Sequence, residues 1–576
     1  MTKEKKYYLK LDYIRAIACF LVLFYHLNII KGGFLAVCTF FVLTGYLKTI
    51  KVLDDKNFSL KKYYVNRFKK IYLPLLLVVF LTLIIYNAFY DTNWLNIKKE
   101  TISVIFGYNN FWQLSVSMNY FTKHISSPFI HLWYISILIQ FDLIFPLVFK
   151  LFKKIDQKTN KHTSTIIVLL LTIASLIYFF VLSKKTNIMP MYYNTFARLY
   201  AILTGVLLAL IHHKYNFKIS RLFKPINNLI FMIYSFILII LCFVISIKTN
   251  NVALYMFLVT LLSTRLIEYA LTDDKIKTNF DRSIYFISKN SYEIYLVQYP
   301  LIYFSEQYKI NSNIKAIIVI ILTILIAWLL HYIIYKKHKK NYKQFLKNLC
   351  LLIIIIYGSF VLYNQKDNSA EMKELENKLE DNAKIKDKKK EEYLNHDVEE
   401  IEEKVDVEQI VTNLPVVGIG DSVLLGAADG LYQKFPNGYF DGKVSRTIRG
   451  GEQVMIDLQN QGRLSDILIL ALANNGDYSD RINTELMNLV GDRQVYWVTA
   501  VLADDPEFNN RFKEFAKNYP NIHIVEWEEA SKNHPEYFYA DGIHLKKEGM
   551  NAYAEIIYNT ILADYQKQYQ NKKNNK

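Results

Sequence analysis

Long apolar runs with few charges recur between Tyr13 and Tyr363, and they constrain this chain more than any other feature. A helix needs about 20 mostly apolar residues to cross the hydrocarbon core of a membrane. We count eleven such runs, at 12–30, 34–50, 71–90, 130–151, 164–183, 195–212, 228–247, 252–270, 292–306, 314–335 and 347–363. The first is too long for a cleaved signal segment. The sequence therefore predicts an α-helical polytopic membrane domain of about eleven spans.

Lysine and arginine residues are unevenly distributed between the loops that join these runs. If the N-terminal segment MTKEKKYYLK is cytoplasmic, loops on its side carry roughly 32 Lys and Arg and the other loops roughly nine, and such an excess marks the cytoplasmic side. An odd number of spans then predicts a multi-pass protein of the cell membrane with an extracellular C-terminal domain. The net charge of +17 follows from this bias, so we expect a lipid bilayer as partner and no nucleic acid.

The sequence changes character after the last apolar run. Residues 364–410 lack Gly and Pro and are dense in charge, which predicts an exposed, partly helical linker; a short coiled coil through Met372, Leu375 and Leu379 is the alternative. Between 411 and 564, short β-branched runs alternate with helix-like segments. This alternation predicts an α/β domain with a parallel sheet flanked by helices. The polar residues 565–576 predict a disordered tail.

A serine follows the first predicted strand of this α/β domain, in the segment VVGIGDSV. We expect the strand to end at Gly420 and Ser422 to stand at the strand-to-helix turn, where α/β sheets present reactive groups. A serine hydroxyl is a weak nucleophile unless a histidine lies within reach and is itself oriented by a third group. The segment DGIHL supplies Asp541 and His544, three residues apart. Ser422 alone could equally be a helix N-cap; with this pair it predicts a catalytic triad.

The GDS motif after the first strand and the D-x-x-H motif after the last resemble the SGNH (GDSL-like) superfamily of esterases and acyltransferases. This resemblance implies an oxyanion hole beside the triad. VSRTIRGG (444–451) resembles the second block of the superfamily, with the backbone amide of Ser445 as one donor where many members have glycine. LANNG (472–476) resembles the third block, with the Asn475 side chain as the other donor and Ala473 where glycine is usual. We expect no metal, because no His, Cys and Asp cluster has ligand spacing.

Two ionisable residues lie in the first predicted span, LDYIRAIACFLVLFYHLN. Arg15 and His26 are eleven residues apart, which leaves about 20° of offset and about 16 Å along a helix, so both share one face. Ionisable residues deep in a membrane are usually functional and face the interior of the helix bundle. The alternative is a snorkelling arginine and a histidine that only packs between helices.

This span resembles the acyltransferase-3 family of integral membrane acyltransferases. The resemblance continues in GGFLAVCTFFVLTGYL (32–47), YYVNRFKKIYLP (63–74), HLWYISILIQF (131–141), YNTFARLYAILTGVLLA (193–209) and SYEIYLVQYPLI (291–302). Cys38 stands where an acidic residue is often found, and Arg67 and Lys70 stand where two arginines are common. We therefore assign 1–346 to this membrane domain and 347–363 to an additional span.

The two resemblances together cover nearly the whole chain. The fusion of the two domains resembles the architecture of the OatA-type peptidoglycan O-acetyltransferases. This resemblance implies that acetyl passes from cytosolic acetyl-CoA across the membrane to Ser422, and then to a hydroxyl of a cell-wall glycan, muramic acid O-6 of peptidoglycan. Acetyl-CoA is a substrate in this scheme, and no bound cofactor is expected.

The same resemblance assigns roles in the membrane domain. Arg15, Arg67 and Lys70 would attract the phosphates of the acyl donor, because cationic side chains suit that task. His26 would act as a general base, and Tyr193 would carry acetyl toward the outer side. Two alternatives remain open: a membrane-tethered extracellular carbohydrate esterase, and a transporter with an appended binding domain.

Overall fold

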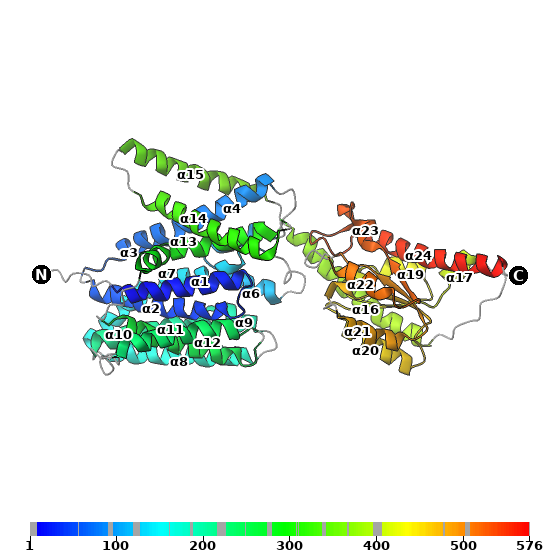
Figure 1. Cartoon of the computed structure of the whole chain (residues 1–576), viewed down its shortest axis with the longest axis horizontal. Helices are drawn as coiled ribbons and strands as arrows, with labels where there is room; N and C mark the ends of the chain where they lie inside the picture. Colours follow the sequence, from blue (N-terminus) through cyan, green and yellow to red (C-terminus); the bar gives the residue numbers. More distant parts are fainter. Residues whose placement is uncertain are drawn as a thin grey trace. The chain divides into compact units, whose positions relative to one another are not determined.

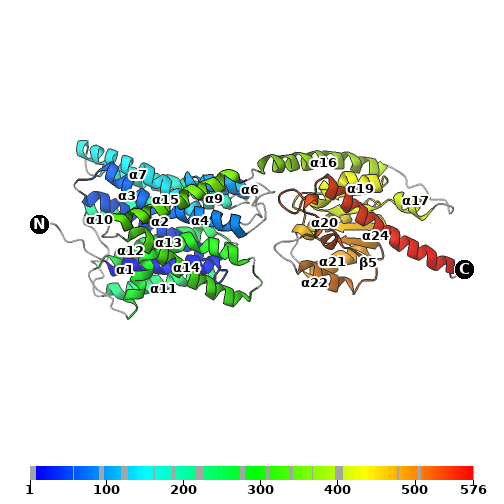
Figure 2. The ribbon, with the colours of Figure 1, turned by 90° about the horizontal axis from the view of Figure 1, so that it is seen from above.

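The computed structural model shows two compact units, Met1–Lys366 and Asp367–Lys576 (Figures 1 and 2). It describes residues 8–574 apart from 56, 90–95, 119–126, 160–161, 185–187, 216–225, 248, 273–278, 307, 309, 337–340, 366–367, 396–405, 476–478 and 502–506. The two units are described separately below.

The first unit is helical throughout its described residues, and its long helices run side by side in a bundle (Figure 1). Its α-helices are α1 (Leu9–His26), α2 (Ala36–Asp54), α3 (Leu60–Arg67), α4 (Leu73–Phe89), α5 (Ile97–Ile105), α6 (Asn109–Met118), α7 (Trp133–Lys158), α8 (Thr163–Ser183), α9 (Met189–Tyr193), α10 (Thr195–Lys214), α11 (Asn227–Val244), α12 (Val252–Ala270), α13 (Asp281–Glu306), α14 (Ser312–Tyr335) and α15 (Asn341–Asn364). Short elements η1 (Gly33–Leu35), η2 (Phe68–Tyr72) and η3 (Ile130–Leu132) join some of them.

Each of the eleven predicted spans coincides with one of the long helices of this unit. Within the described residues, 9 helices are long and apolar enough to cross a membrane. The other two predicted spans correspond to α1 and α13, which carry charged residues such as Asp12 and Glu293 and pack against each other. Polar residues on such helices avoid lipid by facing neighbouring helices.

Small residues allow two of these helices to approach closely. A Cβ added to Gly45 on α2 would lie 2.0 Å from the carbonyl oxygen of Ile202, and one added to Gly205 on α10 would lie 2.0 Å from that of Val42. Both glycines are therefore required for the backbones to touch, as in tightly packed membrane helices. By contrast, α15 exposes large apolar side chains such as Ile356, as expected for a face in lipid.

The second unit contains a five-stranded parallel sheet with strand order β2-β1-β3-β4-β5. Its strands are β1 (Val417–Gly420), β2 (Tyr439–Gly442), β3 (Ile467–Ala471), β4 (Gln494–Val498) and β5 (Ile522–Val525). Its helices are α16 (Ser369–Asn395), α17 (Val407–Thr412), α18 (Ser422–Gly426), α19 (Ala428–Lys434), α20 (Ile448–Asn460), α21 (Asp480–Val490), α22 (Phe508–Ala516), α23 (Trp527–Ser531) and α24 (Lys547–Asn574), with 3-10 turns η6 (Ala473–Asn475) and η7 (Pro535–Tyr537). The predicted α/β architecture is confirmed.

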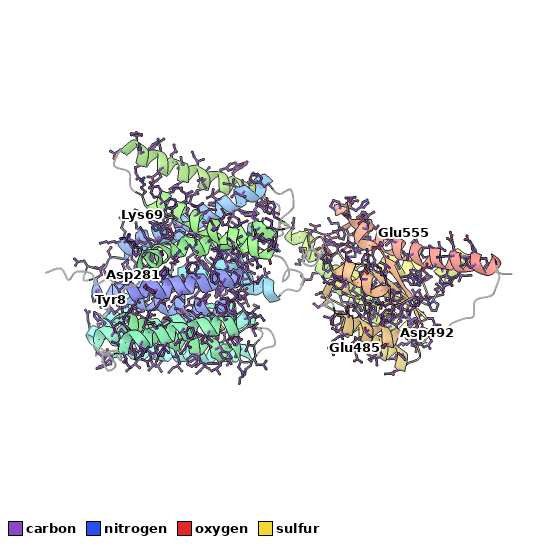
Figure 3. All side chains as sticks on the ribbon, viewed as in Figure 1. Tyr8, Lys69, Asp281, Glu485, Asp492 and Glu555 are labelled. Carbon is purple, nitrogen blue, oxygen red and sulfur yellow. The ribbon has the colours of Figure 1, made fainter. Side chains whose placement is uncertain are left out.

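Both faces of the sheet are buried, which explains why its strands read as almost continuous apolar runs. Along β3, Leu468 and Leu470 join one hydrophobic cluster with residues of α20, α21 and α22. Ile469, which points to the other face, joins a second cluster with residues of α18, α19 and α24. Charged side chains such as Glu485 and Glu555 are exposed on the outside of the unit (Figure 3).

Two segments differ from the sequence-based expectation. Most of residues 364–410, predicted as an exposed and partly helical linker, belong to helices of the second unit. Met372, Leu375 and Leu379 are buried in this unit instead of forming a coiled coil. Residues 396–405 lie outside the described part of the chain. The predicted disordered tail, 565–576, instead continues α24 to Asn574. Its first residue, Tyr565, packs against the core, which stabilises the turns that follow.

Candidate active site of the second unit

Three side chains that are far apart in the sequence of the second unit form a hydrogen-bonded chain. Ser422 begins α18, directly after β1, and its Oγ lies 2.8 Å from Nε2 of His544. His544 Nδ1 lies 2.7 Å from Oδ2 of Asp541, whose other oxygen accepts the backbone amides of Ile543 and His544. This is the geometry of a serine nucleophile, a histidine base and a carboxylate that orients the base. The predicted triad is therefore assembled in the structure.

The environment of Asp541 keeps its carboxylate charged. Burial by itself would raise the pKa of Asp541, but the hydrogen bond and charge of His544 and the two backbone amides outweigh it, so the pKa lies below its usual range. Ser422 is 2% exposed and His544 7% exposed, so the chain of hydrogen bonds is shielded from water. A charged Asp541 fixes the tautomer in which His544 Nε2 can accept the proton of Ser422.

Asp421, the residue before the nucleophile, links the triad to the third predicted block. Its side chain caps α18 by accepting the amide of Val423 at 2.9 Å and also accepts Nδ2 of Asn475 at 3.3 Å. Burial raises the pKa of Asp421, while these hydrogen bonds and the nearby imidazole of His544 lower it in part. Asn475 follows β3 in η6, so Asp421 holds the amide of Asn475 on the same edge of the sheet as Ser422.

The turn that contains Ser445 lies beside this edge. The amide of Lys443 donates to the carbonyl of Gly420 at 3.2 Å, and Arg446 Nη1 donates to the same carbonyl at 3.1 Å. Arg446 also pairs with Asp441 Oδ1 at 2.6 Å through Nη2. Burial would raise the pKa of Asp441, but Arg446 and Lys386 lower it overall. The turn is thus tied to the end of β1.

Strand order explains why these groups meet. β1 lies between β2 and β3, so the strands that follow it in the chain are added on opposite sides of β1. Side chains and amides that follow the three strands, including Ser422, Ser445 and Asn475, therefore gather at one carboxyl edge. Ligands of open α/β sheets bind at this kind of topological switch point.

Ser445 adopts a left-handed backbone with φ of 63°, which costs a residue with a side chain about 1–2 kcal/mol. We therefore expect Ser445→Gly to raise the free energy of unfolding of the protein by about 0.5–1 kcal/mol, after the greater flexibility of glycine in the unfolded chain is included. Lys443→Gly in the same turn, where φ is negative, should lower it by a similar amount. Unfolding in denaturant measures the free energy of unfolding of both variants. A lower value for Ser445→Gly than for the wild type would contradict backbone strain at Ser445.

In the first unit, His26 ends α1 and contacts two residues that sequence analysis quoted in motifs without assigning them a role. Its ring centroid lies 5.1 Å from that of Tyr299 on α13 and 6.1 Å from that of His131 in η3. His131 stacks on Tyr299 at 5.2 Å. The motifs of three separate segments thus converge around His26. The only sign in the sequence that His131 and Tyr299 belong to a site was their place in segments 131–141 and 291–302, which resemble family motifs.

Arg15 and Tyr193 do not join this group. Arg15 pairs with Asp12, Nη1 to Oδ1 at 3.7 Å, near the other end of α1. Tyr193 is buried in α9 and packs edge-on against Trp133 at 5.5 Å. Its carbonyl accepts Nδ2 of Asn110 at 3.0 Å. Among the described residues, no ring contact joins Tyr193 to His26.

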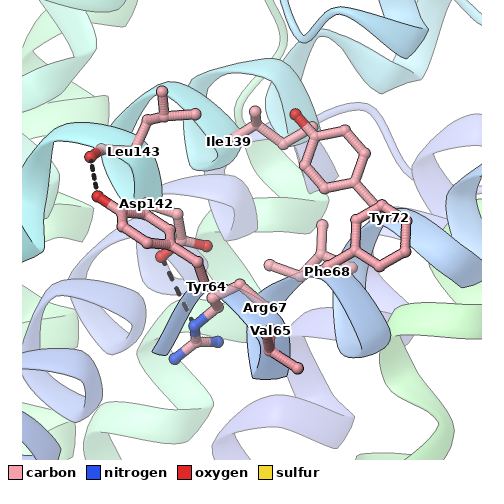
Figure 4. Close-up of a pocket in the computed structure, with 9 residues that line it drawn as sticks. Tyr64, Val65, Arg67, Phe68, Tyr72, Ile139, Asp142 and Leu143 are labelled. Carbon is pink, nitrogen blue, oxygen red and sulfur yellow. Dashed lines mark hydrogen bonds and ion pairs between the residues drawn. The ribbon is translucent and has the colours of Figure 1, made fainter. Parts of the chain in front are cut away.

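A second polar cluster centres on Asp142 of α7. Its carboxylate pairs with Lys48 Nζ at 2.5 Å and Arg67 Nε at 3.8 Å, and it accepts the hydroxyl of Tyr63 at 2.7 Å. Arg67 and Asp142 line a largely apolar cavity of about 350 Å³ (Figure 4). Lys70, predicted to act with Arg67, is exposed on η2 and does not line this cavity. Neither Lys48 nor Asp142 was predicted from the sequence to belong to a site.

Comparison with known proteins places the first unit. A family model described as acyltransferase domain matches residues 8–332, more than half of the chain. The chain belongs to the acyltransferase-3 family. The prediction of a membrane acyltransferase is therefore confirmed.

Relatives extend the similarity of this acyltransferase to both units of the chain. The O-acetyltransferase OatA of Staphylococcus aureus strain MRSA252 is 28% identical over 580 residues, which cover 96% of this chain and 95% of the relative. The OatA of strain COL gives the same values. The solved C-terminal catalytic domain of Streptococcus pneumoniae peptidoglycan O-acetyltransferase A, with a methylsulfonyl adduct, is 21% identical. It covers 28% of this chain and 96% of that domain, with a TM-score of 0.25.

Cys38 contacts a buried arginine of the acyltransferase. Arg198 of α10 is fully buried, its guanidinium lies between the rings of Phe41 and Tyr192 at 5.3 and 5.6 Å, and Nη2 lies 3.5 Å from Cys38 Sγ. An acidic residue at position 38 would face this guanidinium; here the thiol takes its place.

Proposed function

We propose that this acyltransferase is a peptidoglycan O-acetyltransferase that moves acetyl from cytosolic acetyl-CoA to Ser422 and then to a muramic acid O-6 hydroxyl. The observation that carries the proposal is the Ser422, His544 and Asp541 chain in the second unit of a chain whose first unit belongs to a membrane acyltransferase family. A triad alone would fit an esterase. The membrane acyltransferase gives it a source of acyl groups.

In the second unit, acyl transfer takes place in two balanced steps. His544 Nε2 removes the proton of Ser422 as Oγ attacks the carbonyl carbon of the incoming acetyl group. The proton passes to the leaving group of the donor, and an acetyl-serine ester remains. A glycan hydroxyl then gives its proton to His544 and attacks the ester, and Ser422 Oγ leaves and recovers a proton.

The oxyanion of both tetrahedral intermediates needs hydrogen-bond donors. The Asn475 side chain and the Ser445 amide are the candidates, because both follow strands that flank β1. Each such donor contributes about 3 kcal/mol to the stabilisation of the transition state. Asp421 supports this role by accepting a hydrogen bond from Nδ2 of Asn475, which orients that side chain.

In the first unit, we assign donor binding and the first transfer to different ends of the bundle. Arg67 beside the 350 Å³ cavity, together with Arg15 and Lys70, supplies positive charge for the phosphates of acetyl-CoA. His26 acts as general base for the transfer of acetyl away from the thioester. Tyr193, or a tyrosine in contact with His26 such as Tyr299, accepts acetyl on its way to Ser422.

The proposal places the cationic ends of the helices in the cytoplasm and the second unit outside the cell. The excess of Lys and Arg in one set of loops supports this orientation. The eleven spans predicted from the sequence support it too, since an odd number of crossings places the two ends of the chain on opposite sides.

Cells that produce the protein should carry more ester-bound acetate in their walls than cells without it, because the proposed reaction adds acetyl groups to glycan. Alkaline release of acetate from purified walls measures this difference, and mass spectrometry of wall fragments identifies the acetylated hydroxyl. A decrease in wall acetate would instead favour the esterase alternative. Unchanged wall acetate with altered uptake of a solute would favour the transporter alternative.

A further inference from the structure

The highly charged helix α16 has one buried face. Met372, Leu375, Leu379 and Asn382 follow each other at spacings of three and four residues, which places them on one stripe of the helix. All four are less than 9% exposed. The stripe packs on α18 and β2 within the second unit, and Figure 2 shows α16 lying along this unit beside α19. The helix is thus an integral part of the unit that contains the triad.

The N-terminal half of α16 contacts both sides of the loop that carries Asp541 and His544. Glu371 Oε1 pairs with Lys546 Nζ at 2.8 Å. Burial and the nearby carboxylates of Glu374 and Glu371 raise the pKa of the Tyr539 hydroxyl, so Glu374 lies beside this residue. Tyr539 in turn donates its backbone amide to the carbonyl of His544 at 2.8 Å. Two side chains of α16 therefore hold the ends of the loop that supplies the base.

The middle of α16 supports the helix that begins with the nucleophile. The buried Nδ2 of Asn382 donates to the carbonyl oxygen of Leu425 at 2.8 Å. Leu425 lies in the last turn of α18, so this hydrogen bond supports the C-terminal end of that helix. Leu379 packs at 3.5 Å from the position that a Cβ on Gly426 would occupy. A five-residue helix is too short to be stable alone, so these contacts help to fix α18 and Ser422 at its start.

The C-terminal half of α16 reaches the network behind the Ser445 turn. Lys386 Nζ lies 3.7 Å from Asp441 Oδ1, the same oxygen that pairs with Arg446. Arg446 holds the turn through the carbonyl of Gly420. Further along, Tyr393 stacks on Tyr439 of β2, with ring centroids 5.3 Å apart.

We propose that α16 is a positioning element of the catalytic unit. It holds three parts of the site in their relative positions: the loop that carries Asp541 and His544, the helix α18, and the Ser445 turn. Its described side chains act on the site through neighbours, namely Lys546, Leu425 and Asp441. The catalytic unit therefore begins near residue 368 and not near 411. The identity of the reaction rests on the proposed function, but the effect of α16 on the triad does not. Misplacement of reacting groups by about 1 Å costs on the order of a hundredfold in rate, so a partial loss of these contacts should be measurable.

The test uses the full-length protein in detergent and an activated acetyl ester as substrate, with acetate release measured as kcat and KM. We expect Asn382→Leu and Lys386→Met each to lower kcat about tenfold with little change in KM, because the ester still binds but the reacting groups are less well held. Lys386→Arg, which keeps the charge beside Asp441, should restore most of kcat. The matched control is Lys388→Ala, an exposed residue of the same helix, and it should leave kcat unchanged.

The outcomes separate positioning from simple packing. If Asn382→Leu unfolds the second unit, comparison of Lys386→Met with Lys386→Arg still tests the proposal. Lys386 lies at the edge of the interface with 16% of its side chain exposed, so its replacement should leave the unit folded. Wild-type kcat in both Lys386→Met and a folded Asn382→Leu would overturn the proposal. Equal losses in Lys386→Met and Lys386→Arg would also overturn it. A wild-type protein that cleaves the ester but adds no acetate to walls would contradict the proposed function and leave the role of α16 standing.

Discussion

Replacing Ser422 with alanine is expected to lower ester cleavage by the full-length protein at least about a thousandfold, because removal of a triad nucleophile eliminates the covalent step. The hydroxyl lies 2.8 Å from His544 Nε2, and alanine has no atom that can form the ester. Release of acetate from an activated ester by the purified protein measures the effect. Wall acetate in cells that make the variant should fall to the level of cells without the protein.

The matched control for this change is Ser465→Ala. Ser465 precedes β3 and accepts the amide of Ile467 with its hydroxyl, so it lies at the edge of the sheet opposite the triad. It should retain nearly all activity. Ester cleavage by Ser422→Ala at more than a tenth of the wild-type rate would assign the nucleophile to another residue.

His26→Ala is expected to have the second large effect, and only on the complete reaction. Wall acetate should fall to background in cells with normal amounts of this variant, because His26 is the proposed base for the first transfer. Ester cleavage by the purified variant should stay at the wild-type rate, since the triad belongs to the other unit. Exposed His213 at the end of α10 provides the control, and His213→Ala should keep wild-type wall acetate.

The combination of His26→Ala and Ser422→Ala should lower wall acetate no further than either change alone, because both residues act in one sequence of transfers. Normal wall acetate in the His26→Ala strain would contradict the relay through α1. The first unit would then serve only as a membrane anchor.

The triad could be predicted from the sequence because each of its parts obeys a local rule. Ser422 follows a short apolar strand, and Asp541 and His544 are three residues apart, so only the pairing of the two segments had to be inferred. The parallel sheet followed from alternating strand and helix patterns. These features depend on short windows of sequence and on one resemblance.

Other features depend on contacts between distant segments, and the sequence did not predict them. The apolar stripe of α16 has too few residues to be distinguished from a charged linker until α18 and β2 are placed beneath it. The meeting of His26 with His131 and Tyr299 joins three helices that are more than 100 residues apart in sequence. The position of Arg198 beside Cys38 depends in the same way on the close packing of α2 and α10.

The separation of Ser422 and His544 by 122 residues has a consequence for biosynthesis. Chains emerge from the ribosome at about 5–20 residues per second, so the serine is present for several seconds before its base exists. During that time the hydroxyl has no partner that could activate it. The nascent second unit is therefore inert toward esters until the loop that follows β5 has docked beside β1, and reactivity appears together with the completed fold.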